Sequence, residues 1–294
     1  MNMVEELRGI FPIVYTPYDQ QGNIDEEDLR KLCDHLIACG AHGLAGVGNA
    51  SEAELMTSAE RMWMTDIVVD QARGRVPAII GTSAHDTQTA IELSRHAQKA
   101  GAKAVFLMPA TTGPCDEDTI RRHFAAVAGA VDITVMIQDD RIPIAPKQMV
   151  DLSHEFDNIQ YVKEERPDLT GHLITELLEL SDGKLKVMSA GVHLMDELAR
   201  GVVGAIPSSI CVTDFSRAFN LYVQGDRAAA RQAYHHCIPL LYARRQAPRI
   251  WVKEVLRRQG IFKVASVRQP STQTMDDNDL LELTATMELM GPPY

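Results

Sequence analysis

Several features that commonly define a function are missing from this sequence. It has no apolar run that approaches the roughly 18 residues needed to cross a membrane, so we expect no membrane partner. Its first residues, MNMVEELRGIFPIV, lack the basic region and long apolar core of a secretory signal. The five cysteines form no C-x-x-C pair, and an odd number of thiols does not suit a disulfide framework. These absences predict a cytoplasmic protein with free thiols.

An excess of positive charge is missing as well. The formal net charge is −11 at pH 7, whereas proteins that bind nucleic acid usually carry a basic face, so we expect no nucleic-acid partner. This charge does not exclude a small anionic substrate, which needs only a local positive or N–H-lined spot. The ten histidines show no H-E-x-x-H motif or similar ligand spacing. We therefore expect no metal site and no cofactor.

Short apolar runs alternate with helical segments along most of the chain. Eight runs are typical of strands covered on both faces, because each is nearly continuously apolar. They span residues 10–16, 43–48, 76–82, 104–109, 133–138, 159–164, 185–190 and 204–210. Eight such units predict an α/β fold, a (β/α)8 TIM barrel. The alternative, an open doubly wound sheet, would place a G-x-G-x-x-G motif after the first strand, where none occurs.

The last part of the chain has a different pattern. After about residue 225 only helical segments follow, with no linker rich in Gly, Ser or Pro, and about 70 residues form only a small core. We predict a barrel over residues 1–224 and an appended C-terminal helical region, 225–294, packed on it. A string of basic residues there is predicted to be a solvated helix face or an oligomer contact: Arg244, Arg245, Arg249, Lys253, Arg257 and Arg258.

The ends of the strands carry the candidate chemistry, because catalytic groups in such barrels come from the C-terminal strand ends. GNASE (48–52) follows the second run, QDD (138–140) ends the fifth and KEE (163–165) ends the sixth. Side chains alternate along a strand, so Lys163 and Glu165 share one face. That pair is either a strand-end ion pair or, facing inward, a Schiff-base lysine with a carboxylate beside it. For the two aspartates of QDD we favour a solvated turn over a cation or substrate site.

Four motifs carry a resemblance. They are GIFPIVYTPY (9–18), GNASE in the turn, GRVPAIIGT (74–82) and YVKEE (161–165). With them the sequence resembles the dihydrodipicolinate synthase and N-acetylneuraminate lyase family of class I aldolases and dehydratases, across the barrel and into the C-terminal helices. The resemblance implies that Lys163 is the Schiff-base lysine, that a small 2-keto acid is the substrate, and that the chain forms a homotetramer.

Departures from the family pattern point to one branch. Gln138 stands where synthases and aldolases of the family carry a proton-relay tyrosine, and Ala50 replaces the second threonine of their turn. The loop PATTGPCDED (109–118) also lacks the tyrosine that completes the relay. These changes resemble the 2-keto-3-deoxy sugar-acid dehydratases, most of all the L-2-keto-3-deoxyarabonate dehydratase branch. In that branch the glutamate two residues after the lysine is the candidate acid/base, which implies Glu165.

The chemistry of the substitution favours dehydration. A 2-keto acid condenses with Lys163 through C2, and the protonated imine acidifies the hydrogens on C3. Loss of one gives an enamine that expels a protonated C4 hydroxyl, whereas retro-aldol cleavage needs a base on the C4 oxygen. Gln138 cannot take that proton, but Glu165 can serve at C3 and at the leaving hydroxyl. We predict dehydration of a 2-keto-3-deoxy sugar acid, such as L-2-keto-3-deoxyarabonate.

The remaining candidate residues bind the substrate. We expect the turn after the second strand to hold the carboxylate through backbone N–H groups and the side chains of Asn49 or Ser51. This turn consists of Gly48, Asn49, Ala50 and Ser51. Gln138 would line the site, and Ser208 either lines the same mouth or is an ordinary polar residue at a strand end.

Three alternatives stay open. The first is a 2-keto acid aldolase, or a 4-hydroxy-tetrahydrodipicolinate synthase, in which another group replaces the missing tyrosine. The second is a non-catalytic homologue that binds 2-oxo acids. The third, a phosphate-sugar isomerase, would need a glycine-rich phosphate loop, and SAGVH (189–193) and PSSICV (207–212) supply little of one.

Overall fold

The computed structural model describes residues 6–113, 115–166, 170–243, 248–268 and 273–291. Eight parallel strands follow one another around a ring in the order β1-β8-β7-β6-β5-β4-β3-β2. They are β1 (Gly9–Ile10), β2 (Leu44–Gly46), β3 (Ala78–Gly81), β4 (Ala104–Leu107), β5 (Thr134–Asp139), β6 (Ile159–Glu164), β7 (Lys186–Ser189) and β8 (Gly204–Ala205). A parallel bridge between Ile13 and Ala45 joins the segment after β1 to β2 and closes the ring. The predicted barrel is confirmed, with shorter strands than the apolar runs.

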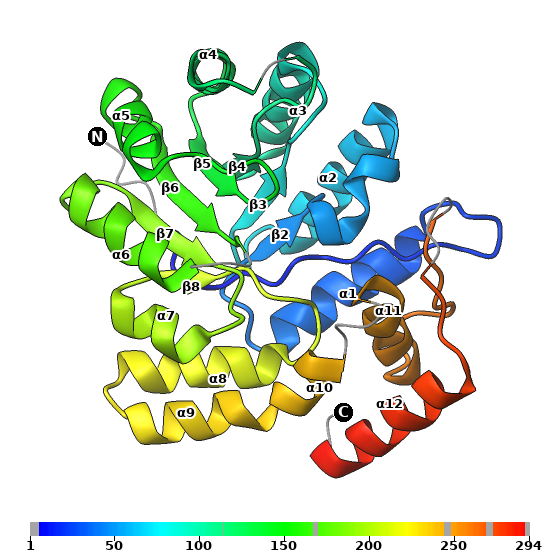
Figure 1. The fold of residues 1–294 in the computed structure, drawn as a ribbon. Coiled ribbons are helices and arrows are strands. Elements are labelled where there is room, and N and C mark those ends of the chain that lie inside the picture. The colour runs from blue at the N-terminus through cyan, green and yellow to red at the C-terminus, as the bar shows by residue number, and fades with distance from the viewer. Residues whose placement is uncertain (1–5, 114, 167–169, 244–247, 269–272, 292–294) are drawn as a thin grey trace.

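Helices surround the strands (Figure 1). The outer helices are α1 (Glu26–Ala38), α2 (Ser58–Ala72), α3 (Thr87–Ala100), α4 (Glu117–Ala128), α5 (Pro146–Glu155), α6 (Thr170–Ser181), α7 (Leu194–Arg200) and α8 (Val212–Val223). Local signals fix their ends, as α3 illustrates. The Asp86 side chain accepts a hydrogen bond from the amide of Thr89, and Gly101 ends the helix at φ 109°, a conformation that favours glycine. No helix in the described part of the chain is long and apolar enough to cross a membrane.

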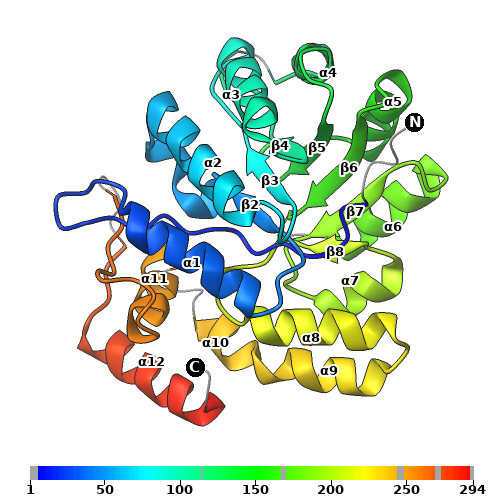
Figure 2. The same cartoon turned by 180° about the vertical axis from the view of Figure 1, so that it is seen from behind.

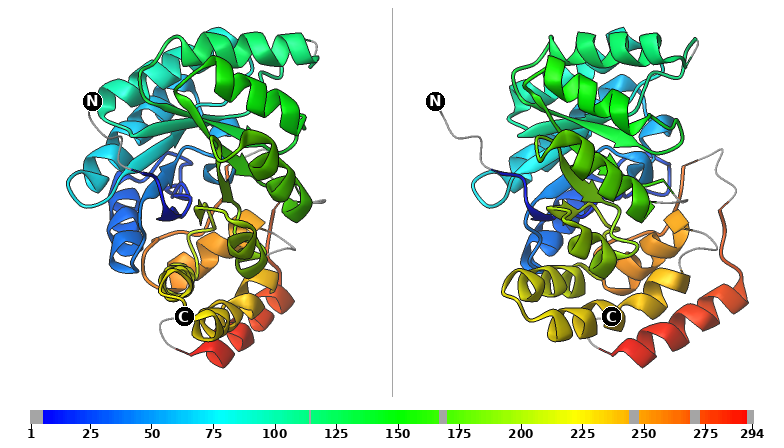
Figure 3. Two further views of the ribbon diagram at one scale, coloured as in Figure 1. Left: turned by 90° about the vertical axis from the view of Figure 1, so that its left-hand side faces the viewer. Right: turned by 60° about the vertical axis from the view of Figure 1, so that its left-hand side comes forward.

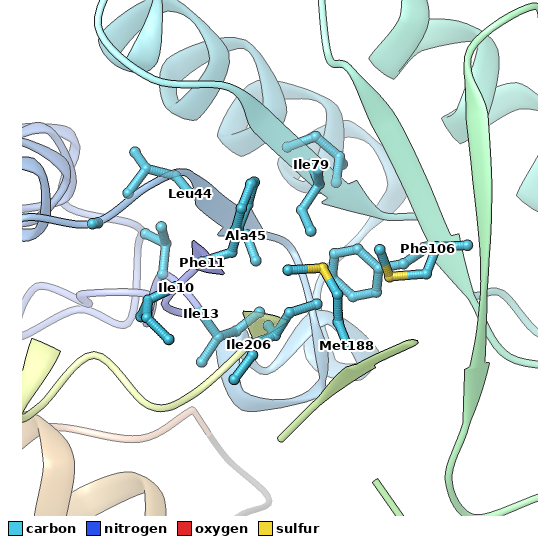
Figure 4. Close-up of a cluster of buried hydrophobic side chains, with 14 of the residues drawn as sticks. Ile10, Phe11, Ile13, Leu44, Ala45, Ile79, Phe106, Met188 and Ile206 are labelled. Carbon is cyan, nitrogen blue, oxygen red and sulfur yellow. The ribbon is translucent and has the colours of Figure 1, made fainter. Parts of the chain in front are cut away.

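Large apolar side chains fill the inside of the barrel. Figure 4 shows part of this cluster, in which Phe11, Ile79, Phe106, Met188 and Ile206 converge from different strands and loops. Each of these side chains is nearly or fully buried. Burying one such side chain contributes about 1.5–3 kcal/mol, so the interior is a packed core and not a pore. Functional groups can therefore gather only at the mouth of the barrel.

Four more helices follow the barrel: α9 (Arg227–His236), α10 (Ile238–Ala243), α11 (Pro248–Arg258) and α12 (Asp277–Met290). They lie together on one side of it (Figure 3), and α11 lies beside α1 (Figure 2). Contacts to α1 hold this region in place, because Lys31 Nζ donates to Gly260 O and the Lys263 amide donates to Asp28 Oδ2 at 2.7 Å. The predicted division near residue 224 falls between α8 and α9, and it remains a proposal.

The predicted solvated basic face is wrong for the residue at its centre. The Lys253 side chain is fully buried, and that of Arg249 is 19% exposed, whereas that of Arg257 is 45% exposed. Arg244 and Arg245 lie outside the described residues. The basic string is therefore not one surface, because α11 turns part of it inward.

Candidate active site

Lys163 points into the barrel. It lies on β6, and its ammonium is 5.6 Å from the ring centroid of Phe106, an interior residue of β4. The Lys163 side chain is 7% exposed, and Nζ pairs with Glu165 Oε2 at 2.8 Å. A buried lysine needs such a partner. Strand alternation left the inward and outward orientations of Lys163 open, and the structure shows the inward one.

Gln138 holds the other side of the same carboxylate. It is the neighbour of Lys163 on β5, and its Nε2 donates a hydrogen bond to Glu165 Oε1. The Glu165 amide also donates to Asp139 O at 3.1 Å, which ties the residue to the end of β5. One oxygen of Glu165 thus meets a neutral amide and the other an ammonium. This arrangement orients the carboxylate, and Lys163 and Glu165 remain free to exchange a proton.

The turn after β2 approaches the same Phe106 ring. A Cβ on Gly48 would lie 2.6 Å from Ile13 Cδ1 and 3.3 Å from a ring carbon of Phe106, so only glycine fits without displacing them. The short 3-10 helix η1 (Asn49–Ser51) follows. The turn and Lys163 therefore both lie next to the Phe106 ring.

Ser51 supports this turn from within. Its hydroxyl donates to Val14 O at 2.6 Å and accepts from the Gly48 amide at 3.1 Å, and the residue is fully buried. The backbone N–H groups of Asn49 and Ala50 open η1, where a helix has no acceptors of its own for its first donors. Ser51 therefore shapes the loop, whereas the amides of Asn49 and Ala50 precede it at the start of η1.

Asp140 belongs to the site, against expectation. Asn49 Nδ2 donates to Asp140 Oδ2 at 2.9 Å, and the Asp140 side chain is only 20% exposed. Burial first and the charge of Glu165 second raise the pKa of Asp140, while Lys163 lowers it. The prediction of a solvated turn is wrong here. Residues 138 and 140 are two apart, so the alternation that placed Lys163 and Glu165 on one face also places Asp140 on the face of Gln138.

Asp139 and Glu164 lie on the opposite faces of the same two strands. Both are fully buried, so the solvated turn is wrong for Asp139 too. Arg166 Nε lies 2.8 Å from Asp139 Oδ2, and the Arg166 amide donates to Glu164 Oε1 at 2.9 Å. Burial and the neighbouring Asp139 raise the pKa of Glu164 to about 8. This cluster faces away from Lys163 and holds the ends of β5 and β6 together.

A cavity of about 180 Å³ lies beside the ends of β7 and β8. Ser208 lines it together with Ala190 and His193, and Ser208 Oγ lies 3.4 Å from the Tyr15 hydroxyl. Ser189 pairs with Glu164, so Ala190 lies at the level of Glu165. Ala190 thus links the level of Glu165 to this cavity, although Lys163 and Glu165 are not among the lining residues.

A second cavity, of about 310 Å³, lies on the other side of the turn and is lined by Gly48, Asn49 and Met108 among others. No group of three His, Cys, Asp or Glu side chains in the described ranges is arranged to hold a metal ion. The chemistry at hand is therefore that of an amine, two carboxylates and backbone amides.

A (β/α)8 barrel that carries a buried lysine–carboxylate pair at the C-terminal ends of its strands has the architecture of a class I aldolase or dehydratase. Comparison with known proteins agrees. The model of the Dihydrodipicolinate synthetase family matches residues 6–289, so the chain belongs to that family and is a Schiff-base lyase.

Two relatives are named 4-hydroxy-tetrahydrodipicolinate synthase. The one from Bacillus subtilis (strain 168) is 28% identical over 283 residues, 92% of this chain and 95% of the relative. The one from Pelobacter propionicus is 32% identical over 236 residues, 77% of this chain and 79% of the relative. A crystal structure of a dihydrodipicolinate synthase has a TM-score of 0.89 and 27% identity, over 97% of this chain and 99% of that one.

A further structure shows the fold alone. The prophage protein YagE of E. coli K12, solved in complex with pyruvate, has a TM-score of 0.90 at 24% identity, over 97% of this chain and 99% of that chain. The relatives thus establish the family and the fold but not the branch within it.

Proposed function

We propose that the protein forms an imine between Lys163 and a small 2-keto acid and dehydrates a 2-keto-3-deoxy sugar acid, such as L-2-keto-3-deoxyarabonate. The observation that carries the proposal is the trio of Lys163, Glu165 and Gln138, in which a carboxylate is held between the nucleophile and an amide that cannot relay a proton.

The first step is imine formation. Transfer of a proton from Lys163 Nζ to Glu165, 2.8 Å away, leaves a neutral amine that attacks C2 of the substrate. The carbinolamine takes the proton back on its hydroxyl and loses water, which gives the protonated imine. Glu165 is thereby a carboxylate again, ready for the next step.

The turn holds the substrate carboxylate during these steps. We assign this role to the N–H groups of Asn49 and Ala50, with Gly48 allowing the close approach and Ser51 fixing the loop from behind. The carboxylate and the keto carbon are adjacent atoms of a 2-keto acid. The Phe106 ring, which contacts both Lys163 and the turn, would then lie beneath both groups.

Elimination uses Glu165 twice. The carboxylate removes a proton from C3, and the resulting enamine expels the C4 hydroxyl, which Glu165 protonates as it leaves. Loss of a C5 proton, protonation at C3 and tautomerisation of the C4–C5 enol then give the saturated aldehyde, and hydrolysis of the imine by water releases the semialdehyde and frees Lys163. Gln138 keeps the carboxylate in place through its amide N–H. The short distal part of the substrate would occupy the cavity of about 180 Å³ beside Ser208.

Aldol cleavage is the second candidate, and Asp140 favours it. This carboxyl group is held by Asn49, feels the charges of Lys163 and Glu165, and has a raised pKa. Such a group can take the C4 hydroxyl proton that the missing tyrosine would have taken. Because two relatives are named 4-hydroxy-tetrahydrodipicolinate synthase, the synthase reaction is a variant of this second candidate.

Two experiments in sequence test the proposal. Borohydride reduction with pyruvate followed by peptide mass analysis should show an adduct at Lys163. Absence of the adduct would contradict every lyase mechanism and leave a 2-oxo-acid-binding protein. With the adduct present, 2-keto-3-deoxypentonates should yield a semialdehyde, whereas release of pyruvate would identify an aldolase.

We also propose that the protein assembles as a homotetramer. Large apolar side chains that are exposed in the single chain, among them Leu180, Val223 and Leu289, support burial against further copies. Light scattering in solution should give four times the chain mass, and the mass of one chain would contradict the assembly.

A further inference from the structure

A second lysine–glutamate pair lies beneath the substrate-binding turn. Lys253 Nζ and Glu52 Oε1 are 2.5 Å apart, and both side chains are fully buried. Glu52 follows η1 directly, and Lys253 comes from α11, 201 residues later in the chain. The catalytic steps use neither residue. Because buried charges are costly unless they are paired and hydrogen-bonded, the pair calls for an explanation.

Every polar end of this pair is occupied. Lys253 also donates to Ser266 O at 2.7 Å and lies 4.3 Å from the ring centroid of Tyr18. The second oxygen of Glu52 accepts from the Arg268 amide at 2.8 Å. Through these contacts one glutamate joins the turn to α11 and to the segment that follows it. The turn cannot shift without disturbing that set of hydrogen bonds.

Glu52 itself has an uncommon backbone. Its φ and ψ are 63° and 31°, the left-handed region that residues other than glycine seldom adopt. Its amide still donates to Asn49 O at 3.1 Å, which closes the turn. Such a conformation persists where surrounding contacts enforce it, and here the ion pair with Lys253 supplies the enforcing contact.

The same helix contacts the other end of the turn. Arg249, four residues before Lys253 and so on the same face of α11, donates to Asn49 O at 2.8 Å and pairs with Glu54. Helix α11 thus contacts the turn at Asn49 and at Glu52, the residues that bracket Ala50 and Ser51. Because Asn49 O and the Ala50 N–H belong to one peptide group, the contact from Arg249 bears directly on the Ala50 amide, and the contact from Lys253 holds the end of the same turn.

We propose that Lys253 is a positioning residue, which acts through Glu52 to orient the N–H groups that bind the substrate carboxylate. The inference rests on the proposed function, because it assumes that the turn binds that carboxylate. On this proposal a residue of the C-terminal helical region helps to shape the active site, although all of the proposed catalytic residues belong to the barrel.

The test measures pyruvate binding in the full-length chain with borohydride trapping on Lys163. In Lys253→Met we expect the pyruvate concentration for half-maximal trapping to rise about tenfold, as for the loss of a well-placed hydrogen bond, with trapping at saturation unchanged. Arg258→Met is the matched control, because Arg258 lies on the same helix but contacts Glu254 and α12. It should leave both values unchanged.

A double variant separates positioning from stability. In Lys253→Met/Glu52→Gln no charge is left buried alone, so thermal stability should recover relative to the single variant. The half-saturating pyruvate concentration should stay raised, because the link to α11 is still absent. Recovery of both together, or no rise in the single variant, overturns the inference.

Two further results are decisive. If Lys253→Met does not fold, Arg249→Gln takes its place, and a half-saturating concentration equal to that of the unaltered protein overturns the inference. If the unaltered protein traps no pyruvate, the proposed function fails and the inference falls with it. If it does trap pyruvate and the variants match it, only the inference fails.

Discussion

Two lysine–glutamate pairs in this protein have nearly the same geometry and different surroundings. At the mouth of the barrel Lys163 and Glu165 are 2.8 Å apart and slightly exposed, and the Lys163 ammonium pairs with Glu165 and lies near the Phe106 ring. Beneath the turn, Lys253 and Glu52 are fully buried. Lys253 has a carboxylate, a backbone carbonyl and an aromatic ring around it.

The difference concerns what each amine is able to do. Burial lowers the pKa of Lys253 to about 8, but its ammonium is already bound to a carboxylate, a backbone carbonyl and the face of Tyr18, and its side chain is fully buried. Lys163 is held by one carboxylate that can take its proton and release it to a substrate. A depressed lysine pKa is therefore a poor guide to catalysis in this fold, and access together with a single exchangeable partner is a better one.

The largest expected effect on activity comes from removing the amine of Lys163. Lys163→Met should abolish both the pyruvate adduct and all turnover, because within the described ranges Lys163 is the lysine that pairs with Glu165. Its stability should change little, since the methionine packs on Phe106 and Glu165 keeps its hydrogen bond from Gln138. Peptide mass analysis and thermal unfolding check the two halves, and an adduct on another lysine would contradict the assignment.

Neutralising the partner should have a large but smaller effect. Glu165→Gln is expected to lower turnover by about 10²–10⁴-fold, the usual contribution of a general acid/base, and to slow imine formation far less, because water can carry the proton in that first step. Single-turnover kinetics with borohydride trapping separate the two. Equal loss of imine formation and turnover would give Glu165 a structural role, like that of Glu52.

For stability we expect the order of the two lysines to be reversed, so that Lys253→Met destabilises the protein more than Lys163→Met does. Lys253→Met leaves Glu52 as a buried unpaired charge and should lower the free energy of unfolding by about 3–5 kcal/mol. Urea denaturation of this variant beside Lys163→Met makes the comparison direct. Similar losses in both variants would mean that the two pairs are not as different as their surroundings indicate.

The smallest expected effect concerns Glu164, which lies between Lys163 and Glu165 in the sequence. The folded pKa of Glu164 is raised from 4.5 to about 8, so its contribution to stability is complete below pH 4.5 and is lost as the pH rises toward 8. Glu164→Gln removes this dependence. Relative to the variant, the unaltered protein should lose up to about 3 kcal/mol between pH 5 and pH 8. Denaturation at both pH values measures it, and parallel curves would contradict it.

Local patterns predicted much of the fold and the core of the site. Apolar runs indicated all eight strands, and alternation put Lys163 and Glu165 on one face. The same alternation places Asp140 on the face of Gln138, but the two adjacent aspartates, Asp139 and Asp140, suggested a solvated turn. What covers a charged residue depends on packing between distant segments, which no local pattern contains.

Lys253 shows this limit most clearly. Its helical spacing fits an exposed basic face, and nothing near it in the sequence indicates a carboxylate partner 201 residues away. Arg249 was misjudged for the same reason, since its partners Asn49 and Glu54 belong to the loop after β2. Single-sequence reasoning picked out the candidate catalytic pair and missed the residues of α11 that contact the turn.

The contact between α11 and the turn also bears on how the protein is made. Chains emerge from the ribosome with the N-terminal residues first, so the turn at residues 48–52 exists long before Lys253 has been synthesised. Until α11 arrives, Glu52 has no ammonium to neutralise it, and the substrate-binding amides remain loosely arranged. On the proposed role of Lys253, a nascent barrel that already contains Lys163 would be a poor catalyst until α11 has been added to it.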